Sequence, residues 1–326
     1  MAKLNMVQAI NLALDEMMAE DPSVIVLGED VGVDGGVFRV TEGLIEKYGE
    51  ARVIDTPLAE SAIIGTAIGM ALAGLKPVGE MQFCGFSYLM IPQLEGHGSR
   101  YRSRTHGQFH VPMVMRVPYG GGVRALEHHS ESREAALGHL PGVKVVIPSG
   151  PRNARSLMRA AILDPDPVVY MEPKRSYRAF KEDVPETPET VEIGKAQVIQ
   201  EGTDVTVIAW GAMMHTTKKA VEEIRQARGA SIELIDLLTI SPMDTETICA
   251  SVRKTGRLAV VQEAPLSFGP ASEIIATVND HALMHLEAPV KRVSGYDVVT
   301  PYFSRENLFM PTVGRARRGI EEVLDF

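Results

Sequence analysis

Four short stretches in the first half of the chain place chemically capable side chains directly after an apolar run. Carboxylates and histidines can move protons near neutral pH, and an aromatic ring offers a face to a flat ligand. Their types indicate a site that binds a flat molecule and exchanges protons with it. The stretches are Gly28–Asp30, Asp55–Ser61, Glu80–Phe86 and Tyr119–Ser132.

Glu60 precedes a helical stretch that is apolar almost all round. Thr56 is a good helix cap and Pro57 suits the first helical position, so we expect Glu60 in the first turn. One interpretation is a carboxylate that complements the helix dipole, which contributes about 0.5 kcal/mol. The other is a carboxylate facing a partly dry space, where it can hold or exchange a proton with a ligand. The small polar face of the helix favours the second.

The third stretch ends in an aromatic residue. Alternation along a strand would place Gln82 and Cys84 on one side and Met81 and Phe83 on the other. Phe86 follows where the strand is expected to end. It is either an ordinary core ring or a platform for a flat ligand.

The fourth stretch contains adjacent histidines, His128 and His129. Both cannot face one point from a regular element, so we expect no two-histidine metal site. One of them can enter a crevice as an acid–base group. The three glycines Gly120–Gly122 allow a tight turn or close approach by another segment. Neither a GxxxxGK phosphate loop nor a strand–GxGxxG–helix fingerprint occurs.

Apolar runs alternate with helical patterns along the chain. Ser23–Leu27 and Pro112–Val117 are typical of strands, and Arg152–Leu163 of a helix with arginines on one face. This alternation predicts an α/β fold with mainly parallel sheets flanked by helices. In such sheets ligands bind beyond the carboxyl ends of the strands, where all four stretches are expected.

A change of composition divides the chain. Lys181–Val191 reads KEDVPETPETV, and its prolines and acidic residues indicate an exposed linker rather than an element. The strand and helix alternation restarts at Val205–Trp210. We therefore expect a first domain at residues 1–180, a linker at 181–192 and a second domain at 193–326.

Composition excludes several classes of function. Lys and Arg number 33 and Asp and Glu 42, for a net charge of −9, which argues against nucleic acid or an anionic membrane as partner. The two cysteines form no disulfide framework. The longest apolar stretch, Ala62–Leu75, is shorter than the ~20 residues a bilayer needs. Met1–Leu14 does not resemble a signal peptide, so we expect a cytoplasmic protein.

The motifs as a set resemble the beta subunits of the thiamine-diphosphate-dependent first component of 2-oxo acid dehydrogenases, a transketolase-like family. The resemblance covers nearly the whole chain and implies a pyrimidine-binding domain followed by a transketolase C-terminal-like domain. It rests on GEDVGVDGGVFRVTEGL, DTPLAESAIIGTAIGMA, GEMQFCGFSY, GGGV with HHSES, GVKVVIPS, DVTVIAWGAMMH, ELIDLLTISPMD, KTGRLAVVQEA and LEAPVKRVSG.

The resemblance implies roles for residues already singled out. Glu60 matches the glutamate that hydrogen-bonds a pyrimidine nitrogen of thiamine and so promotes proton removal from the thiazolium carbon. Phe86 matches the aromatic residue that stacks on the pyrimidine. Gln82 and Glu29 match residues that line the same pocket.

Two further assignments come from the resemblance. His129, rather than His128, matches the histidine that assists substrate binding or acyl transfer to lipoamide. Ala161, Asp164 and Asp166 fall where relatives bind a structural potassium ion.

The resemblance also implies partners. The GDG motif with a following Asn, through which thiamine enzymes hold the diphosphate and Mg²⁺, does not occur in this sequence. An alpha subunit is therefore expected to supply that half of the site, in an assembly of two alpha and two beta chains. The second domain is expected to dock the subunit-binding domain of a dihydrolipoyl acyltransferase.

The reaction implied is oxidative decarboxylation of a 2-oxo acid with acyl transfer to a lipoyl group. Gly85–Tyr88 and the linker resemble members that use pyruvate. A branched-chain 2-oxo acid or acetoin enzyme is the alternative within the class. A non-catalytic scaffold subunit is the alternative outside it.

Overall fold

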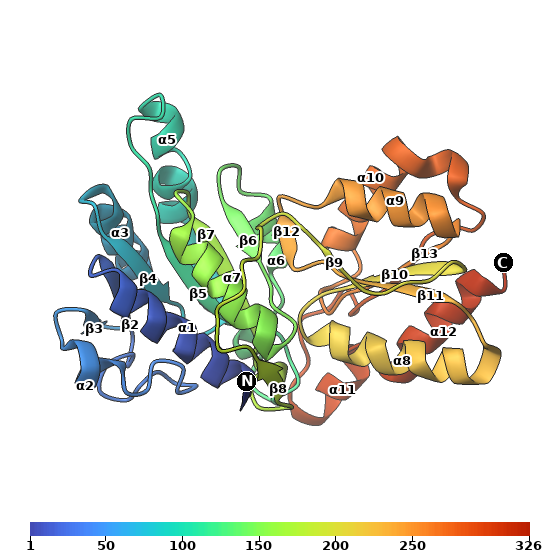
Figure 1. Ribbon diagram of the computed structural model, residues 1–326, viewed down its shortest axis with the longest axis horizontal. Coiled ribbons are helices and arrows are strands. Elements are labelled where there is room, and N and C mark those ends of the chain that lie inside the picture. Colours follow the sequence, from blue (N-terminus) through green and yellow to red (C-terminus); the bar gives the residue numbers. More distant parts are fainter.

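The computed structural model describes all 326 residues, and they form two α/β domains that lie side by side (Figure 1). The first sheet has seven strands in the order β12-β6-β7-β5-β4-β2-β3, all parallel except β12. The predicted parallel sheet flanked by helices is confirmed. The strands are β2 (Val24–Gly28), β3 (Val53–Asp55), β4 (Lys76–Glu80), β5 (Val114–Tyr119), β6 (Lys144–Val146), β7 (Val168–Pro173) and β12 (Thr239–Ser241).

Helices cover both faces of the first sheet. The long helices α1 (Met6–Glu20) and α7 (Pro151–Leu163) pack against each other on one face, while α3 (Glu60–Leu72) packs with α4 (Ser87–Gln93) on the other. Alternate residues of each strand therefore enter two different cores, as a sheet buried on both faces requires. The shorter helices of this domain are α2 (Leu44–Tyr48), the π-helical turn η2 (Leu94–Gly98), α5 (Tyr101–Arg104) and α6 (Glu134–Gly138).

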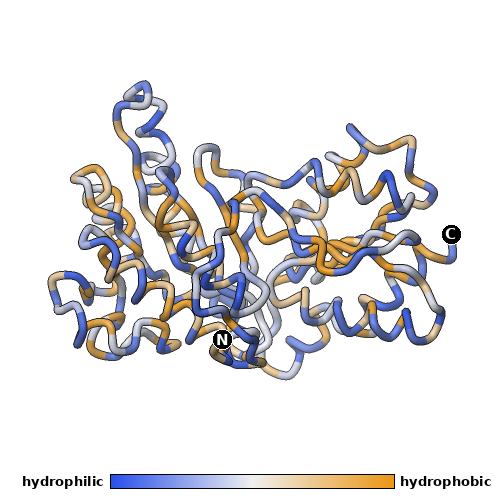
Figure 2. The backbone as a smooth tube through the Cα atoms, in the orientation of Figure 1, coloured by the Kyte–Doolittle hydropathy of each residue, from blue (hydrophilic) through white to orange (hydrophobic).

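The second sheet has five strands in the order β14-β13-β10-β11-β9, with only β9 antiparallel. Helices α8 and α12 cover one face and α9 and α10 the other. Hydrophobic segments concentrate along these strands (Figure 2). The elements are β9 (Gln197–Gln200), β10 (Val205–Ala209), β11 (Ile232–Asp236), β13 (Leu258–Val261), β14 (Lys291–Val293), α8 (Ala212–Arg228), α9 (Thr245–Thr255), α10 (Pro270–Ala282), α11 (Glu306–Phe309) and α12 (Val313–Leu324).

The structure differs from the sequence-based expectation in the presumed linker. Residues Glu182–Val184 form strand β8, which pairs antiparallel with β1 (Ala2–Leu4). A three-residue strand with mixed polarity carries no alternation, so its partner could not be read from the local sequence.

The arginine face of α7 forms ion pairs with helix α1. Arg155 is buried and its guanidinium bonds the Glu16 carboxylate on α1. No helix of the structure is both long and apolar enough to span a bilayer.

Candidate active site

Three of the predicted residues follow three neighbouring parallel strands, whose carboxyl ends lie on the same side of the sheet. Strand β2 lies between β3 and β4. Glu29 directly follows β2, Glu60 comes five residues after β3, and Gln82 follows β4. All three strands are parallel, so their carboxyl ends lie together, at the edge where open α/β sheets bind ligands.

Glu60 is the first residue of α3, because that helix begins later than the sequence suggests. Its N-cap is Ala59, so the prediction of a cap at Thr56 and a first helical residue at Pro57 is wrong. The Thr56 N–H donates to the Gly28 carbonyl oxygen at 2.9 Å, which continues the strand pairing past β3 and delays the helix. Glu60 thus lies at the positive end of the helix dipole, and it is only 7% exposed.

The second carboxylate of the site, Glu29, is equally buried, at 7% exposure. Burial is the main cause that raises the pKa of Glu29, and the charge of Glu60 raises it further. Asp30 and Glu80 act in the same direction. The carboxyl of Glu29 therefore holds its proton more readily than an exposed glutamate does.

The segment after β4 does not continue as a strand. Met81 and Cys84 are both fully buried in one core, so the predicted alternation that separated them is wrong. Cys84–Phe86 instead forms a 3₁₀ turn, η1, that leads directly into α4. Strand β4 ends at Glu80, so strand alternation does not apply to the residues that follow it.

This turn places Phe86 beside a second aromatic residue and a histidine. The Phe86 ring centroid lies 6.1 Å from that of Phe83 and 5.5 Å from the His129 ring. Phe83 and His129 are closer still, at 4.1 Å. Phe83 was not predicted as part of the site, because alternation placed it on the opposite side of the strand.

His129 packs closest to these rings, and the His128 ring centroid also lies 6.1 Å from that of Phe86. His129 ends the 3₁₀ turn η3 (Glu127–His129), which approaches η1 at Gly85. A Cβ atom added to Gly85 would lie 2.0 Å from the His128 carbonyl oxygen, so only glycine permits this contact. The His128 side chain is 46% exposed and faces Glu131, with 3.8 Å between Nδ1 and Oε1.

The surroundings of His129 favour its neutral form. Burial lowers the pKa of His129, and the nearby charges of Lys174 and His128 lower it further, while Glu127 opposes them. Its Nδ1 atom is buried without a hydrogen-bond partner in the protein. A neutral imidazole with a free nitrogen can accept a proton or a hydrogen bond from a ligand.

Lys174 is a residue of this site that the sequence reasoning missed. It directly follows β7, its side chain is buried, and its Nζ lies 5.8 Å from the centroid of the Phe83 ring. Its ammonium donates to the Gly120 carbonyl oxygen at 2.7 Å. The strand-end rule that selected the other residues also applies to Lys174, and would have found it.

A hydrogen bond connects the carboxylate half of the site with the aromatic half. Ser61, next to Glu60, donates through Oγ to the Leu89 carbonyl oxygen at 2.6 Å, and Leu89 follows Phe86 by three residues. The arrangement therefore brings together a buried carboxylate pair, an aromatic platform and a neutral histidine. It can hold a flat heteroaromatic ligand and exchange protons with it.

The predicted potassium residues lie elsewhere, near the amino ends of β6 and β7. Lys144 Nζ contacts both Asp164 carboxylate oxygens, at 2.8 and 2.6 Å, and Arg102 pairs with Asp166. The Ala161 carbonyl oxygen accepts the Asp164 N–H at 3.3 Å. These carboxylates are already neutralised, so their side chains fit an ammonium better than a potassium ion. The potassium site stays a prediction.

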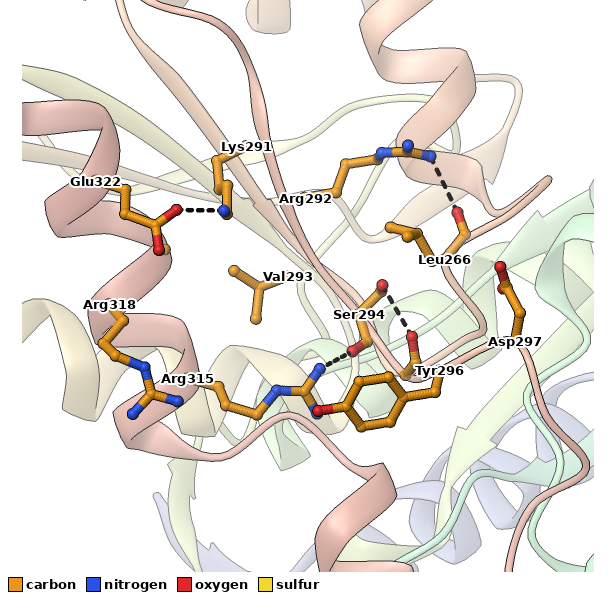
Figure 3. Close-up of a pocket in the computed structure, with 12 residues that line it drawn as sticks. Leu266, Lys291, Arg292, Val293, Ser294, Tyr296, Asp297, Arg315, Arg318 and Glu322 are labelled. Carbon is orange, nitrogen blue, oxygen red and sulfur yellow. Dashed lines mark hydrogen bonds and ion pairs between the residues drawn. The ribbon is translucent and has the colours of Figure 1, made fainter. Parts of the chain in front are cut away.

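A basic hollow of about 340 Å³ lies in the second domain, away from the strand-end site (Figure 3). Three of its cationic side chains, Lys291, Arg292 and Arg315, have structural partners in the chain. Arg315 donates to the Phe309 and Ser294 carbonyl oxygens, and Lys291 pairs with Glu322. These contacts therefore hold α12 against β14 and the residue after it.

Two family models match the chain. The pyrimidine-binding domain of transketolase matches residues 2–179, and the C-terminal domain of transketolase matches residues 194–315. Among solved structures, one described as a split-gene transketolase, an inactive beta4 tetramer, aligns with a TM-score of 0.81 at 21% identity. That alignment covers 99% of each chain and shows the common fold.

Curated relatives are much closer in sequence. The chain is 54% identical over 311 residues to the pyruvate dehydrogenase E1 component subunit beta of Acholeplasma laidlawii, covering 95% of each chain. It is 47% identical to the protein of the same name from Bacillus subtilis (strain 168), over the full length of both. The protein of that name from Staphylococcus aureus is 46% identical over the full length of both.

Proposed function

The chain belongs to the family of beta subunits of the pyruvate dehydrogenase E1 component, and we propose that the strand-end site is its half of a thiamine diphosphate centre. The observation that carries the proposal is the buried Glu60 carboxylate at a helix start beside an aromatic platform. The reaction is the thiamine-dependent oxidative decarboxylation of pyruvate, with transfer of the acetyl group to a lipoyl group of an acyltransferase.

The residues present fit the pyrimidine part of the cofactor. Phe86 offers its ring for stacking, and the buried Glu60 carboxylate can bind a ring nitrogen. Gln82, two residues after β4, can supply both an amide donor and an acceptor. When bound, thiamine diphosphate supplies a carbanion that adds to the keto carbon and retains the electron pair when CO₂ leaves.

Each side chain has a task that its surroundings suit. Glu60 binds the pyrimidine nitrogen and exchanges a proton with it, and Glu29, whose pKa is raised by burial and by the charge of Glu60, lies beside it. His129, whose lowered pKa favours the neutral imidazole, can accept a hydrogen bond or a proton from the substrate or the lipoyl group. The aromatic wall of Phe83 and Phe86 limits the access of water.

The carboxylate and aromatic side chains lie beside apolar surface, which supports a shared site with an alpha subunit. We propose that the alpha subunit covers this surface and holds the diphosphate and Mg²⁺, in an assembly of two alpha and two beta chains. Isolated apolar side chains are common at surfaces, but a group around one site indicates an interface. The exposed apolar residues are Leu58, Tyr88, Leu89, Val123 and Leu126.

Substitution of Glu60 tests the function. In the complex with the alpha subunit, Glu60→Gln should lower the rate of pyruvate decarboxylation about a hundredfold or more, since the amide cannot exchange the proton. The matched control is Glu46→Gln, an exposed glutamate in the first turn of α2, which should leave the rate unchanged. An unchanged rate for Glu60→Gln would exclude the proposed role. Assays with pyruvate, 2-oxoisovalerate and acetoin check the substrate.

A further inference from the structure

We propose that the second domain positions His129, through two buried carboxylates that clamp the loop bearing it. The loop, residues 120–131, leaves β5 and closes on itself, because the Gly120 N–H donates to the Glu131 carbonyl oxygen at 2.9 Å. Glu263 and Glu306 are the positioning residues. This inference rests on the proposed function of His129.

Both carboxylates bind the backbone of the loop directly. Glu263, two residues after β13, accepts the Gly121 N–H through Oε1. Glu306, the first residue of α11, accepts the Arg124 N–H through Oε2 at 3.0 Å. The two donors lie at the start of the loop, and the histidine turn lies at its other end. The second domain thus fixes one arm of the loop, and the Gly85 contact fixes the other.

The clamp is buried and consists of ionisable side chains. Glu263 is 3% exposed and Glu306 1%, and Lys174, at 4%, bonds the Gly120 carbonyl oxygen from the first domain. A buried acceptor that binds a backbone N–H is costly to remove, because the donor is then left unpaired. Glu263, Glu306 and Lys174 therefore fix the backbone of the loop at three places.

The glycine run in this loop is explained by the same clamp. A Cβ atom added to Gly121 would lie 2.8 Å from Glu306 Oε1 and 2.8 Å from Met310 Sδ. Both atoms belong to the second domain. Gly120 likewise approaches Glu263, so two of the three glycines allow an approach between the domains, while Gly122 approaches Arg175 of the first domain. A side chain at position 121 would push the clamp away.

The clamp can be tested by separating loop order from catalysis. Glu263→Ala removes the acceptor, and Glu263→Gln keeps an amide oxygen in its place. In the alpha–beta complex, Glu263→Ala should lower acetyl transfer to a lipoyl domain at least tenfold, with a much smaller effect on decarboxylation measured with an artificial oxidant. Glu263→Gln should restore most of the transfer rate, which it would not do if Glu263 acted as an acid or base.

A second readout does not depend on the proposed function. Hydrogen exchange on the beta chain should show faster exchange of the 120–131 amides in Glu263→Ala, with the central strands unchanged. Gly121→Ala displaces the same loop without removing a charge and should have the same effects. The control is Glu233→Ala, because Glu233 is also buried in the second domain, pairs with Lys254 and accepts the Gly202 N–H at 3.3 Å.

The outcomes are distinct. Normal exchange and transfer in Glu263→Ala, or an equal loss of transfer in Glu263→Ala and Glu233→Ala, would overturn the clamp. Faster loop exchange with unchanged transfer would overturn the positioning of His129. If Glu60→Gln were fully active while the loop exchange still rose, the proposed function would fail and the clamp itself would stand.

Discussion

At the scale of single residues, burial distinguishes the site from ordinary surface groups. Glu60 and Glu29 are both nearly enclosed, and their mutual repulsion raises the pKa of Glu29 beyond what burial alone does. Burial lowers the pKa of Lys174 to about 8, and the charge of Lys174 lowers the pKa of His129. Backbone and aromatic contacts hold these groups in place, although burial disfavours the charged form of each of them.

The aromatic platform makes a prediction at this scale. Phe86→Ala should weaken thiamine diphosphate binding to the alpha–beta complex about tenfold, because a stacked ring contributes on the order of 1 kcal/mol beyond the area it buries. Calorimetric titration measures this. Phe109→Ala removes a half-exposed phenylalanine outside the site and should bind the cofactor normally. Equal affinity for the two variants would show that Phe86 does not stack on the ligand.

At the scale of elements, the junctions between strand and helix decide where the side chains point. Strand β3 is extended by one further hydrogen bond, which delays α3 until Glu60. Strand β4 ends at Glu80, and η1 then turns Phe83 and Phe86 towards the histidine loop. A shift of one residue at either junction would rotate these side chains away from the site.

A substitution at Gly85 tests the contact between η1 and η3, and Gly69 serves as the control. Gly85→Ala should lower the free energy of unfolding by about 1–3 kcal/mol, since its methyl group would collide with the His128 carbonyl oxygen. Gly69→Ala, in α3 with no atom within 4 Å of an added Cβ, should be neutral or stabilising by up to about 1 kcal/mol. Urea denaturation of the two variants gives the comparison. Equal effects would show that the contact is not tight.

At the scale of the whole molecule, the two domains share structure and do not merely adjoin. Strand β12 belongs to the second half of the chain but pairs antiparallel with β6 at the edge of the first sheet. One hydrophobic core runs through both domains. Buried polar contacts add to it, among them the bond from Ser149 Oγ to Asp236 Oδ1 at 2.7 Å. The two domains are therefore joined by a shared sheet, a shared core and buried polar bonds.

Asp236 makes the stability of this interface depend on pH. Burial raises the pKa of Asp236 from 3.8 to about 7. A group with a raised native pKa contributes stability that is fully present below its unfolded pKa and is lost as the pH rises through its native value. The free energy of unfolding should thus fall between about pH 4 and 7, by up to on the order of 4 kcal/mol.

Replacement of the carboxyl group checks that contribution. Asp236→Asn should flatten the pH dependence and be more stable than the natural chain at pH 8, because the amide stays neutral and its oxygen can still accept the Ser149 hydroxyl. Thermal unfolding of both chains from pH 4 to 8 measures how their stability depends on pH. A curve parallel to that of the natural chain would assign the pH dependence to other groups, such as Glu134, whose pKa burial raises to about 7.

The sequence alone was enough for the α/β class, the parallel sheets, the family and the strand-end positions of Glu29, Glu60, Gln82 and Phe86. Local periodicity and residues adjacent in the chain carry that information. Only the tertiary structure decided the start of α3, the turn after β4, and strands β8 and β12. It also decided the contacts of Lys174, Glu263 and Glu306 with the loop at residues 120–131. Each depends on a partner far away in the chain, and a contact between distant segments leaves no periodic trace in either one.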